Sequence, residues 1–283
     1  MTTTEKKEEK FKPTQLTDVP AFPVVAIKTL QAISREREAL TELSNLISTD
    51  AAISAGILRM ANSALFNIRF EISGILQAIH MLGLERVKGV VVTVAMKSYL
   101  GESIEVPVLR ACWRHSLACA VVAQEFAKAS LMEADTVYTA GLMHDVGRLG
   151  LIAAYPKEYA DFLLKADDHP CDALAREREE FGVDHCQAGQ LLVTRWNLPK
   201  IFSEVTLRHH DDPVLGESSI LSVVRRSCRM ADTLGFGVVQ PLHPLSYEDI
   251  LENFPERERK QFPKDSSEMT QHIAARINSI ESV

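Results

Sequence analysis

The spacing of apolar residues restricts the fold of this chain more than any other feature of its sequence. In successive segments between Val24 and Ile280, apolar residues recur at every third or fourth position, which is the period of an amphipathic helix. Breaks such as Asp211-Asp-Pro213 and Gly235-Phe-Gly237 separate the periodic segments. The sequence therefore predicts an all-α fold made of many helices.

The periodic segments set the bounds of these helices. Ser48-Thr-Asp50 offers N-cap side chains before one helix, and Gly83 is expected to end another. Val90 to Val94 is β-branched and could form a strand, but the helical pattern continues on both sides and favours a buried helix. The expected helices cover residues 24–33, 40–47, 53–62, 73–82, 84–99, 108–128, 135–143, 150–154, 156–166, 173–181, 183–196, 201–210, 218–234, 246–253 and 266–280.

The same pattern divides the chain into four parts. Residues 1–15 are expected to form a disordered tail, because this segment is polar and charged. An N-terminal helical module is expected over residues 16–105, a helical core over 106–240, and a C-terminal helical extension over 241–283.

Composition narrows the class of protein. A chain of 283 residues with 46% hydrophobic content can bury a sizeable core. Because it begins with polar residues and has no apolar run of the roughly 20 residues that cross a bilayer, we expect a cytoplasmic protein without membrane contact. A net charge of −7, without a Lys/Arg stripe, disfavours nucleic acid as a partner.

Five cysteines without a C-x-x-C pair predict reduced, mostly buried thiols.

An adjacent imidazole and carboxylate, His144-Asp145, lies in the segment Ala140-Gly-Leu-Met-His-Asp-Val-Gly-Arg-Leu-Gly150. The glycines that follow the pair predict that a helix loosens into a turn at this point. Both side chains are ligand types that divalent metals accept. Taken alone, the pair is more typical of solvated residues or of a helix cap.

Other imidazoles and carboxylates accompany this pair along the helical region. In an all-helical bundle, such side chains from separate helices can meet in the core and bind metal. We expect one divalent metal at His115, His144, Asp145 and Asp232. We expect a second metal at His185 with one or both of His209 and His210, and Asp145 can bridge the two because a carboxylate has two oxygens.

Each of these residues also has a plain structural interpretation. His115 alone is typical of an ordinary core histidine, and His185 would suit the first turn of a helix. Successive helical residues point about 100° apart, so only His209 of the His209-His210 pair is expected to face the site. Asp232 favours a site, because a carboxylate in an apolar segment is rarely buried without a partner.

A pair of neighbouring divalent metals can generate hydroxide and clamp a phosphoryl group during displacement. Mixed His/Asp ligation suits Fe, Mn, Zn or Ni. Arg148 lies three residues beyond Asp145, so we expect it on the same side, where it could hold a phosphate bidentately. Asp145 and Arg148 are therefore the candidate catalytic residues. Cys186, next to His185, is expected to point away from the site.

The order His115, His144-Asp145, Asp232 resembles the metal-binding signature of the HD phosphohydrolase superfamily, and His185 and His209-His210 look like the extra histidines of its dinuclear members. More closely, the region from Leu16 to Gly237 resembles the HDOD family, the HD-related output domain of bacterial signalling proteins. The matching segments are Ile47-Ser-Thr-Asp50, Leu58-Arg-Met-Ala-Asn-Ser63, Ala78-Ile-His-Met-Leu-Gly83, Arg114-His-Ser116, Ala140-Gly-Leu-Met-His-Asp-Val-Gly-Arg148, Gly182-Val-Asp-His185, Arg195-Trp-Asn-Leu-Pro199 and His209-His210.

This resemblance implies an HD-domain-like helical bundle preceded by an N-terminal helical module. It also implies a regulatory protein with a signalling partner and a retained metal site. The alternative is an active metal-dependent phosphohydrolase acting on a nucleotide or another phosphate ester. Asp211-Asp-Pro213 stands where related cyclic-di-GMP phosphodiesterases continue with Gly-Tyr-Pro, which disfavours that activity, and Arg148 replaces the lysine common after His-Asp in active HD enzymes.

Overall fold

The computed structural model describes residues 16, 19–32, 37–167, 170–212 and 217–282, and its regular elements over these ranges are all helical. The predicted all-α fold is confirmed, whereas the predicted tail, residues 1–15, lies outside the described residues. The elements are α1 Val24–Gln31, α2 Arg37–Ser48, α3 Ala51–Ala61, η2 Ala64–Phe66, α4 Ile75–Leu82, α5 Leu84–Leu100, η3 Gly101–Glu105, α6 Pro107–Ala129, α7 Ala134–Met143, α8 Val146–Ala154, α9 Pro156–Asp167, α10 Ala173–Phe181, α11 His185–Arg195, α12 Lys200–Arg208, α13 Ile220–Ala231, η4 Asp232–Phe236, α14 Tyr247–Glu252, α15 Glu256–Arg259 and α16 Ser266–Glu281.

Local capping chemistry places several of the helix ends. The Asp50 side chain accepts a hydrogen bond from the backbone N–H of Ile53, as predicted for the start of α3. Ser246 and Asp249 form a capping box at the start of α14. The β-branched segment 90–94 lies inside α5, so the helical prediction there is correct.

Several predicted helices end earlier than expected, and two of these ends lie close to histidines or carboxylates of interest. The helix predicted over 201–210 ends at Arg208, which leaves His209 and His210 in a turn. The helix predicted over 218–234 ends at Ala231 and continues as a π-helical turn, η4, that begins at Asp232.

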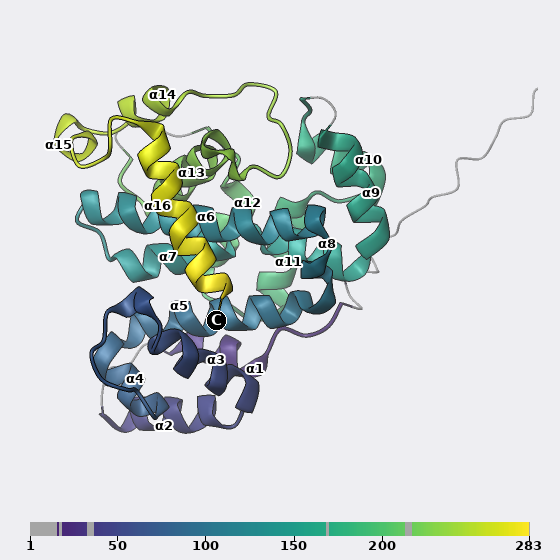
Figure 1. Ribbon diagram of the computed structural model, residues 1–283. Coiled ribbons are helices and arrows are strands. Elements are labelled where there is room, and N and C mark those ends of the chain that lie inside the picture. The colour runs from purple at the N-terminus through teal and green to yellow at the C-terminus, as the bar shows by residue number, and fades with distance from the viewer. Residues whose placement is uncertain (1–15, 17–18, 33–36, 168–169, 213–216, 283) are drawn as a thin grey trace, which may run out of the picture.

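The N-terminal helices lie together at one end of the molecule, where α1 and α3 pack against α5 (Figure 1). Helix α5 also contacts α7, and in this way joins the N-terminal helices to the remaining ones. Among the described helices, none has the length and apolar character that a bilayer span requires.

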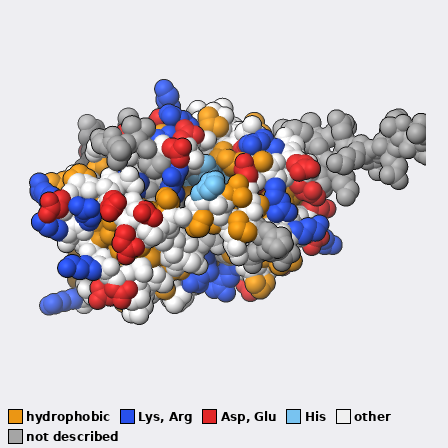
Figure 2. All heavy atoms as spheres, turned by 90° about the horizontal axis from the view of Figure 1, so that it is seen from above, with side chains coloured by type: hydrophobic (Ala, Val, Ile, Leu, Met, Phe, Trp, Pro, Cys, Tyr) orange, Lys and Arg blue, Asp and Glu red, His pale blue; other side chains and the backbone are white. Residues whose placement is uncertain are grey.

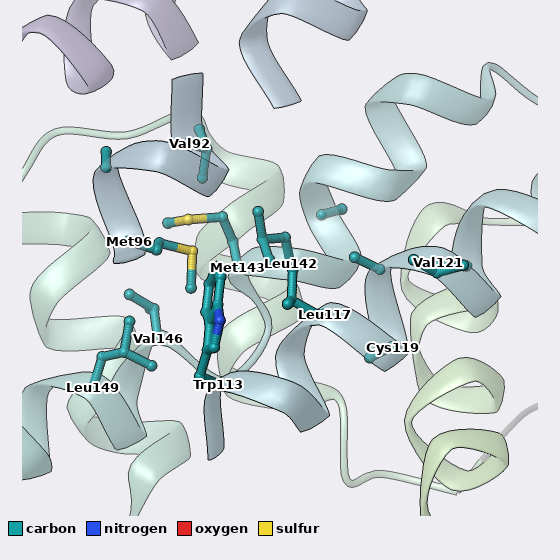
Figure 3. Packing of buried hydrophobic residues seen from close by; sticks show 14 of the residues in the cluster. Val92, Met96, Trp113, Leu117, Cys119, Val121, Leu142, Met143, Val146 and Leu149 are labelled. Atoms are coloured by element: carbon teal, nitrogen blue, oxygen red, sulfur yellow. The ribbon is translucent and has the colours of Figure 1, made fainter. Parts of the chain in front are cut away.

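The core is centred on α6, which is buried on all sides over residues 115–124. Figure 3 shows Trp113 of α6 among apolar side chains contributed by α5, α7 and α8. Because α6 is held by neighbours on every side, a polar side chain on it, such as His115, has a fixed position.

The C-terminal helix α16 runs across α6, and its end reaches towards α5 (Figure 1). Glu281 forms ion pairs with Arg110 and Arg114 of α6. The ammonium group of Lys97 in α5 donates to the backbone carbonyl of Glu281 at 3.1 Å. Residues of the expected C-terminal extension therefore pack directly on the core.

Candidate metal centre

The turn between α7 and α8 brings an imidazole and a carboxylate into the protein interior. His144 follows the last residue of α7, and Asp145 precedes the first residue of α8, so the predicted loosening of the helix is confirmed. Asp145 is only 1% exposed. Helices α8 and α11 cross closely next to this turn, because a Cβ on Gly147 would lie 1.8 Å from the backbone oxygen of His185. This close crossing places the first residue of α11 beside Asp145.

Four histidines from separate elements point their Nε2 atoms at the Asp145 carboxylate. The Nε2 atoms of His185 and His209 lie 3.3 and 3.4 Å from its Oδ1. Those of His115 and His144 lie 3.9 and 3.8 Å from its Oδ2. The structure therefore gathers these predicted site residues around one carboxylate.

The Nδ1 atom of each of these rings faces a hydrogen-bond acceptor. His144 Nδ1 lies 2.6 Å from the Gly141 carbonyl oxygen, and His115 Nδ1 lies 3.1 Å from that of Phe236. His209 Nδ1 lies 3.0 Å from the Thr206 carbonyl, and His185 Nδ1 lies 2.6 Å from a Glu177 carboxylate oxygen. Because carbonyl and carboxylate oxygens only accept, each Nδ1 carries the proton and each Nε2 presents a lone pair.

This arrangement leaves buried lone pairs facing one another. Asp145 Oδ1 and His209 Nε2 have no hydrogen-bond partner among the residues that the structure describes. A buried polar atom without a partner is costly, and a cation shared between the lone pairs would remove that cost. Burial lowers the pKa of His144 well below its usual 6.5, against the opposing effect of Asp145, so its ring is neutral and able to bind a metal.

The separations match those of ligands on one ion. Two imidazole nitrogens bound to zinc at about 2.0–2.1 Å lie roughly 3.3–3.4 Å apart in a tetrahedron. The Nε2 atoms of His115 and His144 are 3.3 Å apart. Those of His185 and His210 are 2.9 Å apart, which corresponds to roughly a right angle at an ion with the same bond length. The residues present therefore fit a divalent metal.

Two further predictions about this cluster are wrong. His209 and His210 are both candidate ligands, but at most one ring was expected to face the site; both lie there with centroids 4.4 Å apart. The reason is that α12 ends at Arg208, so the angle between successive helical residues does not apply. Cys186 was expected to point away, but its Sγ lies 4.0 Å from His209 Nδ1.

Asp232 lies at the edge of the cluster. Its Oδ1 is 3.5 Å from His115 Nδ1, on the side of the ring away from Nε2, and its side chain is 26% exposed. Burial raises the pKa of Asp232, against the opposing effect of His115. In this structure Asp232 therefore lies beside the Nδ1 side of the His115 ring, and its expected role as a metal ligand stays a prediction.

Arg148 faces the same side as Asp145, as its spacing predicted. Its Nε donates to Asp145 Oδ2 at 2.8 Å, and one of its terminal nitrogens donates to Glu177 at 3.1 Å and to the Tyr159 hydroxyl at 2.9 Å. Burial acts to raise the pKa of Asp145, but Arg148, His185 and His144 outweigh it and hold that pKa well below its usual range. Arg148 thus holds the Asp145 carboxylate in its ionised form, and its predicted contact with phosphate remains untested.

Glu177 and Tyr159 belong to this network and were not identified from the sequence. Glu177 is fully buried and accepts from the His185 backbone, the His185 ring and the Tyr159 hydroxyl. A usable signal existed in α10, because Ala173, Glu177 and Phe181 are spaced four apart and form its buried face. A glutamate in the middle of an apolar stripe indicates a buried polar contact.

Glu177→Gln is expected to weaken metal binding about 10- to 100-fold, because the amide would present N–H groups where His185 and Arg148 need an acceptor. Competition with a chelating dye measures the metal affinity. Glu179→Gln, on the exposed side of the same helix, is the control and should bind metal as the unaltered protein does. Equal affinities for the two variants would contradict this role of Glu177.

A cleft of about 560 Å³ opens onto the cluster. One wall carries His115, His209, His210 and Asp232, and the other includes the loop 238–245 between η4 and α14. Figure 2, which shows the molecule from above, has a histidine side chain at the surface between charged and apolar side chains. The candidate metal centre is therefore buried on one side and reachable from solvent on the other.

Comparison with known proteins identifies relatives of the chain. The sequence model of the HDOD domain matches residues 19–212. An uncharacterized protein of Treponema pallidum (strain Nichols) is 25% identical over 211 residues, which cover 70% of this chain and 39% of that protein. This chain thus spans about two fifths of the length of that relative.

Solved structures share the fold over almost the whole chain. An HDOD domain protein of unknown function from Geobacter sulfurreducens has a TM-score of 0.68 and 23% identity, with 95% of each chain covered. A proposed phosphohydrolase from Shewanella amazonensis SB2B has a TM-score of 0.66 and 20% identity, also with 95% of each chain covered. A proposed signal transduction protein from Marinobacter aquaeolei VT8 has a TM-score of 0.62 and 17% identity, with 94% of this chain and 59% of that chain covered.

Proposed function

The chain belongs to the HDOD domain family, and from this premise we propose that it is a signal-transduction protein with a divalent-metal centre around Asp145. One metal position lies by His115 and His144, and the other by His185, His209 and His210. The proposed partner is a signalling protein or a phosphate-containing small molecule that reaches the cleft.

One observation carries the metal centre: histidine Nε2 lone pairs converge on a buried carboxylate that has an unpaired oxygen. A change of tautomer cannot remove these facing lone pairs, because each Nδ1 proton is donated to an acceptor oxygen. Such outer contacts on Nδ1 are the usual means of fixing metal-binding histidines.

The cleft supports a regulatory role more than a hydrolytic one. Arg148 and Arg229 both line it, and both already have carboxylate partners within the protein, Asp145 and Asp212 respectively. Asp172 and Asp232 add acidic groups to the same walls. A phosphate ester entering the cleft would therefore rely on metal for most of the opposing charge.

A metal-dependent phosphohydrolase is the second candidate, because the cleft opens directly onto the cluster. The Shewanella structure with the same fold bears the name of a proposed phosphohydrolase. Bound divalent metals would supply water activation and charge neutralisation for phosphoryl transfer. The chain's own residues would keep the Nδ1 protons in place, hold the Asp145 carboxylate against Arg148, and exclude water from the buried side.

A ligand and turnover screen of metal-loaded protein separates the two functions. Phosphate monoesters, nucleoside phosphates and cyclic dinucleotides would each be tested by calorimetry for binding and by phosphate release for turnover, beside Asp145→Asn. The regulatory account predicts no turnover above that of Asp145→Asn. Turnover that disappears in Asp145→Asn would establish the hydrolase instead.

A further inference from the structure

We propose that the thiolate of Cys228 is a metal ligand at the position next to His115 and His144, an inference that rests on the proposed metal centre. Cys228 lies on α13, and its side chain is buried. Its Sγ is 3.6 Å from His115 Nε2. Cys228 Sγ and nitrogen atoms of His115 and His144 all lie within 4.8 Å of one another.

Two of the three separations among these atoms match ligands on one tetrahedral ion, and the third, between Cys228 Sγ and His144, is within 4.8 Å. With zinc–sulfur and zinc–nitrogen distances of about 2.3 and 2.0–2.1 Å, the sulfur and a nitrogen lie roughly 3.6 Å apart and two nitrogens roughly 3.3 Å apart. The structure has 3.6 Å between Cys228 Sγ and His115 Nε2, and 3.3 Å between the two Nε2 atoms.

Beside the lone pair of His115 lies the sulfur of Cys228 rather than the carboxylate of Asp232. Asp232 lies four residues after Cys228, about one helical turn further, and contacts the opposite nitrogen of the His115 ring. The thiol contacts Nε2, which carries the lone pair. Cys228 therefore lies closer to the metal-facing atom of His115 than Asp232 does.

The other cysteines near the cluster lack a contact with a histidine lone pair, although Cys186 Sγ lies within 4.8 Å of ligand atoms of His185, His209 and His210. Cys186 Sγ lies beside His209 Nδ1, a nitrogen that carries a proton held by the Val205 and Thr206 carbonyls. Cys119 Sγ lies 4.0 Å from the Val224 carbonyl oxygen. Cys119 is therefore the matched control for Cys228, and Cys186 tests whether a thiolate at the other metal position contributes.

A thiolate ligand restricts the metal. Sulfur is a soft donor that favours Zn²⁺, Fe²⁺ and Co²⁺ over the hard cations Mg²⁺ and Mn²⁺, which prefer oxygen. When the metal binds, the thiol proton leaves to solvent and the sulfur–metal bond forms without oxidation of either atom. The metal position next to His115 should thus bind softer metals than the position next to His185, whose proposed ligands are histidine nitrogens and the Asp145 carboxylate.

Cobalt absorption tests the assignment, because Co²⁺ bound to a thiolate gives an intense near-ultraviolet charge-transfer band that nitrogen and oxygen ligands do not give. Metal-free protein would be titrated with Co²⁺, and bound cobalt counted by elemental analysis. We expect the band in the unaltered protein, in Cys186→Ser and in Cys119→Ser, and its loss in Cys228→Ser. Cys228→Ala is the second variant, should the serine at this buried position disturb folding, which circular dichroism would reveal.

The possible failures are distinguishable. Cobalt bound to the unaltered protein without the charge-transfer band would overturn the thiolate ligand and leave the metal centre intact. A band that persists in both Cys228 variants would also overturn it. No cobalt bound by the unaltered protein would overturn the metal centre and the thiolate ligand together.

Discussion

Gly147→Ala is expected to lower the free energy of unfolding by about 3 kcal/mol or more, the largest loss that we predict for a single methyl group. The added Cβ would lie 1.8 Å from the backbone oxygen of His185 and 2.6 Å from the backbone nitrogen of Gly189. Both atoms belong to the α11 backbone, so no side chain can move aside to make room. Helices α8 and α11 would have to separate, and Asp145 would move away from His185.

Gly74→Ala is the control for this substitution, because a Cβ at Gly74 would meet nothing within 4 Å. Its cost should stay below about 1 kcal/mol, the usual effect of replacing glycine at an N-cap. Urea denaturation of both variants measures the difference. A Gly147→Ala protein as stable as Gly74→Ala would show that α8 and α11 do not cross as closely as described.

Arg148→Met is expected to lower the free energy of unfolding of chelator-treated protein by about 3–5 kcal/mol. The substitution removes the cation from a buried ion pair and leaves buried carboxylates without a partner. The Arg148 side chain is 4% exposed and that of Asp145 is 2% exposed. Glu177 would lose the same partner. Added divalent metal should restore part of the stability, since it supplies positive charge at Asp145.

Arg110→Met is the matched control, because Arg110 also pairs with a carboxylate, Glu281, but is 47% exposed. Solvent screens such a pair, so its loss should cost no more than about 1 kcal/mol. Thermal and urea unfolding with and without metal would compare the two variants. If Arg148→Met and Arg110→Met lowered the free energy of unfolding equally, the buried contacts of Arg148 with Asp145 and Glu177 would not stabilise the protein.

Much of the fold could be predicted because helical periodicity and caps are local signals. The Ser246 and Asp249 capping box is visible in four consecutive residues. The His144-Asp145 turn was expected from Gly147 and Gly150, but both glycines lie inside α8. Helix ends were less certain. The early end of α12 at Arg208 depends on packing rather than on a local break, and it decides how His210 points.

The site was only partly predictable, because some of its residues are placed by the packing of helices rather than by a local sequence pattern. His115, His144, His185 and His209 belong to a recognisable order of residues, and the structure brings them together. Cys228 gave no such signal, because a buried cysteine is ordinarily a small apolar residue. Glu177 gave only a local one, its place between Ala173 and Phe181 on the buried face of α10, which does not say which histidine it contacts. Their positions relative to the histidines depend on how α13 and α10 pack, which no local pattern specifies.

Metal content per chain tests the central claim most directly. Protein purified without chelator, and metal-free protein reloaded with Zn²⁺ or Fe²⁺, would be measured by elemental analysis beside Asp145→Asn and Asp145→Ala, with folding checked by circular dichroism. The account predicts about two metal equivalents in the unaltered protein and loss of both in each folded variant, because one carboxylate serves both positions. No bound metal after reloading, or the same content in the Asp145 variants, would contradict it.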